Sequence, residues 1–243
     1  MKCAIIIPSR YGSSRLPAKA LADIDGKSLV QWVFEACKKV SNANKVIIAT
    51  DHPLIEKAAQ DFGADVMMTS SAHQSGTDRC AEVAQNLDVD FIINVQGDEP
   101  FIDPKTIEVM IRMLGSNPKI EILTLFHKMR GQDEIADPSK VKLVLDNCGR
   151  VLYFSRSPIP YQTALDSGMP FYKHVGLYAF RKEALLSVSK MPVSSLEKAE
   201  RLEQLRWMEN GMSIHGLEIA EATLGVDTPE DLEKARAFAR NYC

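Results

Sequence analysis

Short runs of consecutive apolar residues alternate with longer stretches of helical periodicity in the first half of the chain. The runs at 3–7, 46–49 and 91–95 are apolar at nearly every position rather than at every second one, which is typical of strands that are covered on both faces. Such strands, separated by helical segments, are the signature of β-α-β units around a parallel sheet. The pattern therefore predicts an α/β fold with a mostly parallel sheet flanked by helices.

Capping residues indicate where several of the helices begin. Ser28 followed by Gln31 forms a capping-box pattern ahead of an apolar stripe. Asp103-Pro104 supplies an N-cap and a first-turn proline before another stripe, and Thr228-Pro229 repeats this arrangement near the end of the chain. We expect helices to begin directly after Ser28, Asp103 and Thr228, and we expect the last of them to be docked rather than to form a tail.

The segment from about 121 to 180 has a different character. Turns that contain Gly and Pro separate four strand-like pieces, at 122–126, 141–145, 151–154 and 175–180. We interpret this segment as a smaller antiparallel lobe that extends the α/β core. Because no internal repeat or low-complexity linker interrupts the chain, the sequence predicts a single domain over residues 1–243.

Charge and cysteine usage narrow the functional class. The chain carries 29 basic and 32 acidic residues, a net charge of −3, with no run of either sign. This balance argues against nucleic acid as a partner and favours a small anionic ligand met by a few local cations. The five cysteines form no Cys-x-x-Cys pair, so we expect neither a zinc site nor a disulfide framework. The first apolar run, which ends at Pro8, is too short for a signal peptide or a membrane span. We therefore expect a cytoplasmic protein without membrane insertion.

A cationic loop follows the first apolar run. Residues 8–19 contain one glycine, three serines and the cations Arg10, Arg15 and Lys19. Ligands of open parallel sheets bind beyond the carboxyl ends of the strands, where this loop begins. Its N–H groups, hydroxyls and cations can neutralise a triphosphate, although a solvated basic turn is an equal alternative. The loop lacks the glycine patterns of P-loop and Rossmann proteins, which disfavours kinases and dehydrogenases.

Two aspartates and one serine-rich segment carry further candidate chemistry. Asp98 lies at the end of the run at 91–95, where its carboxylate could hold Mg²⁺ or merely cap a turn. The segment 75–79 precedes a helical stretch and could simply cap that helix. Asp227 stands directly before Thr228 and could be an ordinary turn residue. The residues alone leave these alternatives open.

Polar residues in the second half could bind carboxylate and hydroxyl groups of a ligand. Arg156 can clamp a carboxylate, and hydroxyl groups can be bound by His174, Tyr178, Glu203 and Gln204. Each of these residues, taken alone, is more often a satisfied structural residue or a polar position on a helix.

Taken together, the motifs resemble the sugar nucleotidyltransferases, and the CMP-Kdo synthetases in particular. The segment Ile7-Pro-Ser-Arg-Tyr-Gly-Ser-Ser-Arg-Leu-Pro-Ala-Lys19 is similar to the N-terminal signature of that family, and five separated motifs keep the family's order between Ile6 and Leu232. One departure concerns the family's Leu-Pro-Gly-Lys-Pro-Leu, where this chain has Ala18 and Ala20. We expect Ala18 to stiffen the loop and to exclude a positive φ.

The resemblance implies a function and an assembly. It implies a Mg²⁺-dependent cytidylyltransferase on a Rossmann-like sheet, which forms CMP-Kdo and pyrophosphate from CTP and 3-deoxy-D-manno-octulosonate (Kdo) for the inner core of lipopolysaccharide. A homodimer is expected, in which the lobe near 121–180 contributes to sugar binding and dimerisation. The alternatives are a cytidylyltransferase for 8-amino-3,8-dideoxy-manno-octulosonate or for a sialic acid, and a non-catalytic nucleotide-sugar sensor on the same fold.

The resemblance also assigns site residues. Catalysis falls to Arg10, Arg15, Lys19, Asp98 and Asp227, of which the two aspartates would hold Mg²⁺. The nucleotide would be bound by Pro8, Arg10, Tyr11, Gly12, Ser13, Ser14, Arg15, Lys19, Thr69, Ser75, Gly76, Arg79 and Gln96, with cytosine and ribose at Ser75, Gly76 and Arg79. The sugar acid would be bound by Gln96, Arg156, His174, Tyr178, Glu203 and Gln204.

Overall fold

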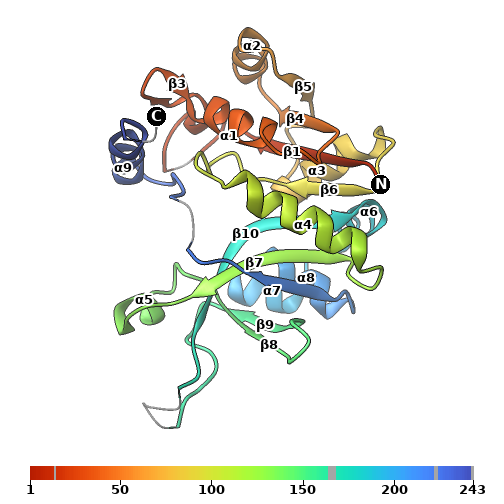
Figure 1. The fold of residues 1–243 in the computed structure, drawn as a ribbon, viewed down its shortest axis with the longest axis vertical. Coiled ribbons are helices and arrows are strands. Elements are labelled where there is room, and N and C mark those ends of the chain that lie inside the picture. The colour runs from red at the N-terminus through yellow and green to blue at the C-terminus, as the bar shows by residue number, and fades with distance from the viewer. Residues whose placement is uncertain (14, 164–167, 222–223, 242–243) are drawn as a thin grey trace. The chain divides into compact units, whose positions relative to one another are not determined.

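The computed structural model describes residues 1–13, 15–163, 168–221 and 224–241, and it divides the chain into two compact units. Unit 1 comprises Met1–Gly115, Ala179–Ser189 and Thr223–Cys243. Unit 2 comprises Ser116–Tyr178 and Lys190–Ala222. Figure 1 shows the elements of both units. The expectation of one domain with a lobe near 121–180 stays a prediction.

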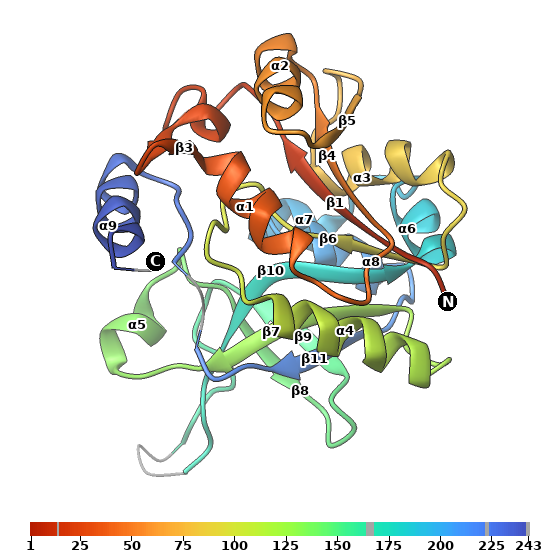
Figure 2. The same ribbon diagram turned by 45° about the horizontal axis from the view of Figure 1, so that its top comes forward.

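Unit 1 is built on a parallel sheet. Its strands β1 (Cys3–Ser9), β4 (Lys45–Thr50), β5 (Asp65–Met68) and β6 (Phe91–Asn94) are arranged in the order β6-β1-β4-β5, and each neighbouring pair is parallel. Residues 3–7 of β1 are at most 1% exposed, because α1 (Leu29–Lys38) and α3 (Gly76–Gln85) pack against β1 from opposite sides (Figure 2). The prediction of a parallel sheet from uniformly apolar runs is confirmed.

In the part of the chain that the structure describes, the remaining elements of unit 1 are a 3-10 turn, a hairpin and four helices. They are the 3-10 turn η1 (Lys19–Leu21), the hairpin of β2 (Asp23–Ile24) and β3 (Lys27–Ser28), and the helices α2 (Pro53–Asp61), α4 (Pro104–Ser116), α6 (Lys182–Val188) and α9 (Pro229–Ala239).

The three predicted helix starts are confirmed, with one difference in capping. Asp103 Oδ1 accepts a hydrogen bond from Lys105 N at 3.1 Å, directly before the first residue of α4. Thr228 forms a complete capping box at the start of α9. Ser28 accepts from the N–H of Gln31, but the Gln31 side chain donates to Glu35 at 3.0 Å instead of reaching back. Only half of the predicted box therefore forms at α1.

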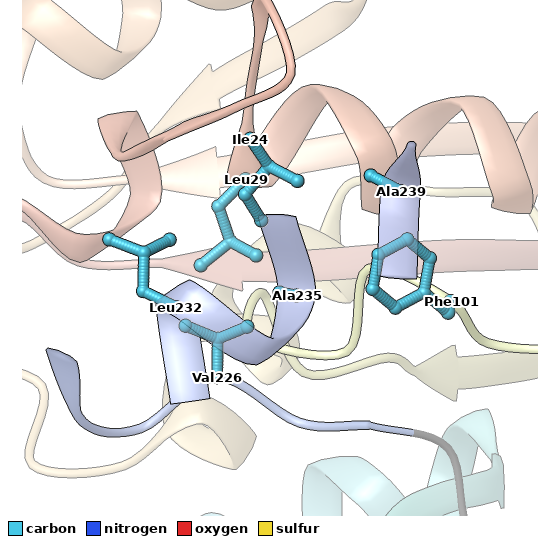
Figure 3. Close-up of a cluster of buried hydrophobic side chains, with 7 residues drawn as sticks. All are labelled: Ile24, Leu29, Phe101, Val226, Leu232, Ala235 and Ala239. Carbon is cyan, nitrogen blue, oxygen red and sulfur yellow. The ribbon is translucent and has the colours of Figure 1, made fainter. Parts of the chain in front are cut away.

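A cluster of buried side chains fixes α9 to the rest of unit 1. Figure 3 shows Leu232, Ala235 and Ala239 of this helix together with side chains from distant segments, namely Ile24, Leu29, Phe101 and Val226. All seven residues are at most 8% exposed. Burial of an aliphatic or aromatic side chain contributes about 1.5–3 kcal/mol. The last helix is thus docked, as its apolar spacing predicted.

Unit 2 contains the predicted antiparallel extension. Strand β8 (Lys142–Leu145) pairs antiparallel with both β9 (Val151–Ser155) and β10 (Tyr172–Arg181), although the last residues of β10 belong to unit 1. Strand β7 (Ile122–Lys128) departs from the expectation, because it pairs in parallel with β11 (Ile214–Glu218). Three short helices complete the unit: α5 (Gln132–Ala136), α7 (Ser195–Glu200) and α8 (Glu203–Glu209). Within the described residues of the whole chain, no helix is both long and apolar enough to cross a membrane.

Candidate active site

A polar pocket of about 280 Å³ lies in unit 1, beside the carboxyl ends of β1 and β6. The predicted residues that line it are Pro8, Arg10, Ser13, Arg15, Lys19, Ser75, Gly76, Arg79, Gln96, Asp98 and Asp227. The lining residues that the sequence did not single out are Ser9, Ala20, His73, Gln74 and Gly97. The predicted residues Tyr11, Gly12 and Thr69 lie outside this lining, and Ser14 lies outside the described residues.

Two aspartates that are remote in the sequence meet at one ammonium group in this pocket. Lys19 Nζ lies 2.6 Å from Asp98 Oδ2 and 3.0 Å from Asp227 Oδ1, across 208 positions of sequence in the second case. Arg15 Nη2 lies 3.0 Å from the same Asp227 oxygen. The aspartate side chains are 29% and 48% exposed. Two cations and two carboxylates therefore neutralise one another at the mouth of the pocket.

The main chain explains how Asp227 reaches Asp98. Val226 N–H donates to the carbonyl oxygen of Asp98 at 2.9 Å. The Val226 side chain is fully buried in the cluster of Figure 3, and Thr228 caps α9 immediately afterwards. Because Asp227 is held between an anchored residue and a helix cap, its backbone has little freedom to move away from Asp98.

The charges around Lys19 decide its protonation state. Burial lowers the pKa of Lys19, but the charges of Asp98 and Asp227 and their hydrogen bonds outweigh burial, so its pKa is raised above the ordinary value. Lys19 is therefore a permanent cation in this pocket at neutral pH. Of the three predicted loop cations, Arg10 alone is exposed without an ion pair to the described residues, and it too lines the pocket.

The backbone of the cationic loop contradicts one prediction. Ala18 adopts φ 51° and ψ 33°, a left-handed conformation that we expected alanine to exclude. The turn requires this conformation, because Ala18 precedes η1 and its carbonyl oxygen accepts from Leu21 N–H at 2.8 Å. A left-handed backbone costs an L-residue roughly 1–2 kcal/mol, which the contacts of Lys19 can offset. The loop thus keeps its turn although it lacks the family's glycine.

Two glycines let backbone segments approach each other beneath the pocket. A Cβ atom on Gly97 would lie 2.7 Å from Ser9 Oγ and 2.9 Å from the carbonyl oxygen of Pro8. A Cβ atom on Gly76 would lie 3.1 Å from Pro8 Cγ. The end of β1 is therefore packed directly against the segment that carries Asp98 and against the start of α3.

The start of α3 combines the two interpretations that the sequence left open. Ser75 caps the helix by accepting from Asp78 N at 3.1 Å, and it also lines the pocket. Arg79 is 3% exposed and donates to Asp51 Oδ2 at 2.9 Å and to the Thr69 hydroxyl. Asp51 Oδ1 in turn accepts from Tyr11 N–H at 3.2 Å. Arg79 thus links α3 to the cationic loop through Asp51, and it also lines the pocket.

His73 and Gln74 are pocket residues that the sequence argument passed over. His73 Nε2 is hydrogen-bonded to Glu82, and Gln74 Nε2 donates to the carbonyl of Ala72 at 2.9 Å. The Ser70 N–H and His73 hold the pKa of Glu82 below its ordinary value. Both residues directly precede the segment 75–79. Their position beside a predicted ligand contact could have identified them from the sequence.

In unit 2, His174 and Tyr178 lie in an aromatic row. Ring centroids are 5.0 Å apart for Phe154 and His174, 5.5 Å for His174 and Tyr178, and 5.1 Å for Tyr178 and Trp207. His174 Nε2 lies 2.9 Å from Thr124 Oγ1. Burial of the ring lowers the pKa of His174 to about 3, and burial also raises the pKa of Tyr178. Both side chains are therefore neutral groups at physiological pH.

Helix α8 carries the predicted pair Glu203 and Gln204. Glu203 Oε1 accepts from Arg206 Nη2 at 2.9 Å, and Gln204 is 6% exposed. Arg206 Nε also lies 3.2 Å from Glu197 Oε2 of α7. Arg206 thus joins α7 to the first turn of α8, which carries Glu203 and Gln204.

Arg156 is held by main-chain carbonyl groups. Its guanidinium donates to the carbonyls of Glu200 at 2.7 Å, Pro138 at 2.9 Å and Arg201 at 3.4 Å. These bonds use three of five N–H donors, so within the described residues two donors are left for a ligand. The predicted roles of Arg156 and of the other sugar-site residues stay predictions.

Comparisons with known proteins place the chain in a family. The model of the family described as cytidylyltransferase matches residues 4–214. The 3-deoxy-manno-octulosonate cytidylyltransferase of Escherichia coli is 46% identical, over 98% of this chain and 96% of that protein. The protein of the same name from Flavobacterium johnsoniae is 42% identical, over 99% and 100% of the two chains.

A solved structure gives the same result for the fold. It is described as CMP:2-keto-3-deoxy-manno-octonic acid synthetase complexed with CTP, and it is 44% identical to this chain. It superposes with a TM-score of 0.96 over 100% of both chains. The predicted nucleotidyltransferase fold is thereby confirmed.

Proposed function

We propose a function from the premise that the chain belongs to the cytidylyltransferase family and, within it, to the 3-deoxy-manno-octulosonate cytidylyltransferases. The enzyme forms CMP-Kdo and pyrophosphate from CTP and Kdo. The observation that carries this conclusion in the structure is the meeting of Lys19, Asp98 and Asp227 in one pocket at the carboxyl ends of parallel strands. Ligands of such sheets bind at that edge.

The reaction needs a bound triphosphate and an aligned sugar hydroxyl. The C2 hydroxyl of Kdo attacks the α-phosphorus of CTP, and the bond to the bridging oxygen breaks to release pyrophosphate. Arg10, Arg15 and Lys19 neutralise the negative charge that accumulates on the phosphate oxygens and on the leaving pyrophosphate. No covalent intermediate with the enzyme is needed, because holding both reactants in line supplies much of the acceleration.

Asp98 and Asp227 fit the donor set of a Mg²⁺ site. Lys19 binds Asp98 Oδ2 and Asp227 Oδ1, and Arg15 binds the same Asp227 oxygen. Among the described residues, no ion pair involves the other oxygen of either carboxylate, so these oxygens remain for a ligand. Mg²⁺ is usually held by one or two carboxylates together with substrate phosphates. When bound, the ion supplies charge to the α-phosphate and lowers the pKa of the attacking hydroxyl.

Removal of the metal tests this part of the proposal. Enzyme treated with EDTA and desalted should release no pyrophosphate, and MgCl₂ should restore release in proportion to occupancy. Asp98→Asn and Asp227→Asn should each shift the MgCl₂ concentration for half-maximal activity upward. Full activity after rigorous chelation would contradict the metal assignment.

Sugar and nucleotide choice are tested by one matrix of substrates. Pyrophosphate release should be measured with CTP or UTP against Kdo, its 8-amino analogue and N-acetylneuraminate. The names of the relatives favour Kdo with CTP over both other sugars. A higher kcat/KM with the 8-amino analogue or the sialic acid would overturn the choice of sugar. Absence of turnover with every pair, together with tight CTP binding, would instead support a nucleotide-sugar sensor.

The wider setting follows from family membership. We propose that the enzyme works as a homodimer in the cytoplasm, where it supplies CMP-Kdo for the inner core of lipopolysaccharide. The three fully buried cysteines, Cys3, Cys37 and Cys80, suit a reducing compartment. Light scattering during size-exclusion chromatography checks the dimer, since a monomer has a mass of 27.0 kDa. Cell fractionation checks the compartment.

A further inference from the structure

Lys142 is a buried cation that the proposed reaction does not use. It stands at the first position of β8 in unit 2, and its side chain is 0% exposed. Its ammonium donates to the carbonyl oxygens of Asp137 at 3.0 Å, Lys140 at 2.8 Å and Arg156. Lysine is almost never fully buried unless its charge is compensated, so this position calls for a physical role.

The hydrogen-bond partners of Lys142 indicate a structural role rather than a chemical one. An ammonium group has three N–H donors, and three carbonyl oxygens accept from it here. Burial lowers the pKa of Lys142, while the charge of Asp137 opposes this. A group whose donors are all engaged by main-chain oxygens cannot act as a nucleophile or bind a ligand. Lys142 instead joins three backbone segments at one point.

One of these segments carries Arg156, which is fixed from two further directions. Glu200 Oε2 accepts from Arg156 N–H at 2.9 Å, and Glu200 Oε1 accepts from Ser155 Oγ at 2.6 Å. The Arg156 guanidinium in turn donates to the carbonyls at 200 and 201. Arg201 has φ 54° and is followed within two residues by α8 with Glu203 and Gln204. The network thus links Arg156 to the start of the helix that carries other predicted sugar contacts.

We propose that Lys142 is a positioning residue for the sugar acid. It acts by fixing the main-chain carbonyl of Arg156, and Glu200 is its counterpart at the main-chain N–H of the same residue. This inference rests on the proposed function and on the predicted role of Arg156 in binding the Kdo carboxylate. The two N–H donors of Arg156 that are left over among the described residues bind the substrate. Lys142 and Glu200 hold the main chain of Arg156 so that these donors point towards the substrate. CTP, which binds in the pocket of unit 1, should be indifferent to both residues.

The test compares Michaelis constants for the two substrates in full-length enzyme. Lys142→Met keeps the length of the side chain and removes the charge. It should raise the KM for Kdo about tenfold, and it should leave the KM for CTP within about twofold. Lys182→Met is the matched control, because Lys182 Nζ also donates to a main-chain carbonyl, that of Leu87 at 2.5 Å, but in unit 1. Both constants should be unchanged in this control.

Arg156→Ala separates failure of the inference from failure of the proposed function. Loss of a charge-paired contact should raise the KM for Kdo about thirtyfold or more, with little effect on CTP. If Arg156→Ala changes neither constant, the proposed sugar site is wrong and the inference falls with it. If Arg156→Ala raises only the KM for Kdo while Lys142→Met raises neither constant or both equally, the inference alone is overturned.

A double variant gives a readout that a general loss of stability would not mimic. If Lys142 acts through Arg156, the KM for Kdo of Lys142→Met/Arg156→Ala should equal that of Arg156→Ala alone. Multiplication of the two effects, to about 300-fold, would refute the coupling. Should Lys142→Met fail to fold, Glu200→Gln replaces it in the same comparison. A selective rise in the KM for Kdo then supports the inference, and an unchanged KM for Kdo contradicts it.

Discussion

The cations of the two candidate binding regions are held in different ways. In unit 1, Lys19 and Arg15 are paired with the side chains of Asp98 and Asp227. In unit 2, Lys142 and the guanidinium of Arg156 are bound to main-chain carbonyl oxygens. Side-chain ion pairs at a partly exposed site are weak and can be exchanged for ligand charges, whereas carbonyl groups remain in place. Under the proposed function, the difference predicts an adaptable site for the triphosphate and a preformed site for the sugar acid.

The largest expected effect comes from removal of one charge in the adaptable pocket. Asp98→Asn should lower kcat for pyrophosphate release by about a hundredfold or more, because a preorganised electrostatic contact to the reacting group is lost. Its far-UV circular dichroism should stay unchanged. Asp88→Asn is the control, since the Asp88 side chain is 93% exposed and pairs with Lys2 at the surface. Near-normal turnover of Asp98→Asn would remove Asp98 from the reaction.

A smaller effect is expected from a steric clash between the backbone segments that meet at Gly97. Gly97→Ala would place a methyl group 2.7 Å from Ser9 Oγ and should cost about 1–3 kcal/mol of the free energy of unfolding. The KM for CTP should rise as well, because Pro8 and Ser9 would have to move. Gly176→Ala in β10 is the matched control, since no atom lies within 4 Å of the added Cβ. Equal denaturation midpoints for the two variants would contradict the close packing.

Acid should lower the free energy of unfolding through the aromatic row of unit 2. His174 has a folded-state pKa of about 3, below the unfolded value of about 6.5. The unfolded chain therefore binds the extra proton between these values, and stability falls as the pH falls from 6.5 towards 3. Between pH 7 and pH 5 the loss should be at most about 2 kcal/mol. Urea unfolding midpoints at pH 7 and pH 5, measured for the natural chain and for His174→Gln, check this loss. An equal decline of the midpoint in the two proteins would exclude His174 as the cause.

The smallest effect concerns the strained turn before Lys19. Ala18→Gly should raise the free energy of unfolding by up to about 1 kcal/mol, because glycine adopts a positive φ without strain although it loses more entropy on folding. Ala20→Gly should have the opposite sign, since Ala20 is 5% exposed within η1 and has no positive φ to relieve. Thermal unfolding of the pair measures the difference. Destabilisation of both variants to the same degree would show that Ala18 is not strained.

Local signals allowed much of the fold to be predicted. The uniformly apolar runs identified β1, β4 and β6, because burial on both faces leaves no alternation of polar residues. The caps at Asp103 and Thr228 located α4 and α9, because these side chains bond to N–H groups within the same turn. By contrast, the parallel partner of β7 is β11, some 90 positions later. Strand pairing over that distance depends on the whole fold rather than on a local pattern.

The site shows the same division between local and distant causes. The loop cations and Asp98 could be proposed from the strands that they follow. The approach of Asp227 could be inferred only from family resemblance, because it depends on a main-chain bond from Val226 to Asp98. The left-handed backbone of Ala18 contradicted a rule based on residue type, because the contacts of a turn can outweigh a cost of about 1–2 kcal/mol.

The hydrogen bond from Val226 to Asp98 has a consequence for biosynthesis. Asp227 follows every other residue of the pocket lining in the sequence, so it leaves the ribosome well after them. A nascent chain that has folded its parallel strands still lacks one of the two carboxylates at Lys19. The pocket is therefore completed only after residue 227 has been made, even where the parallel strands have already formed.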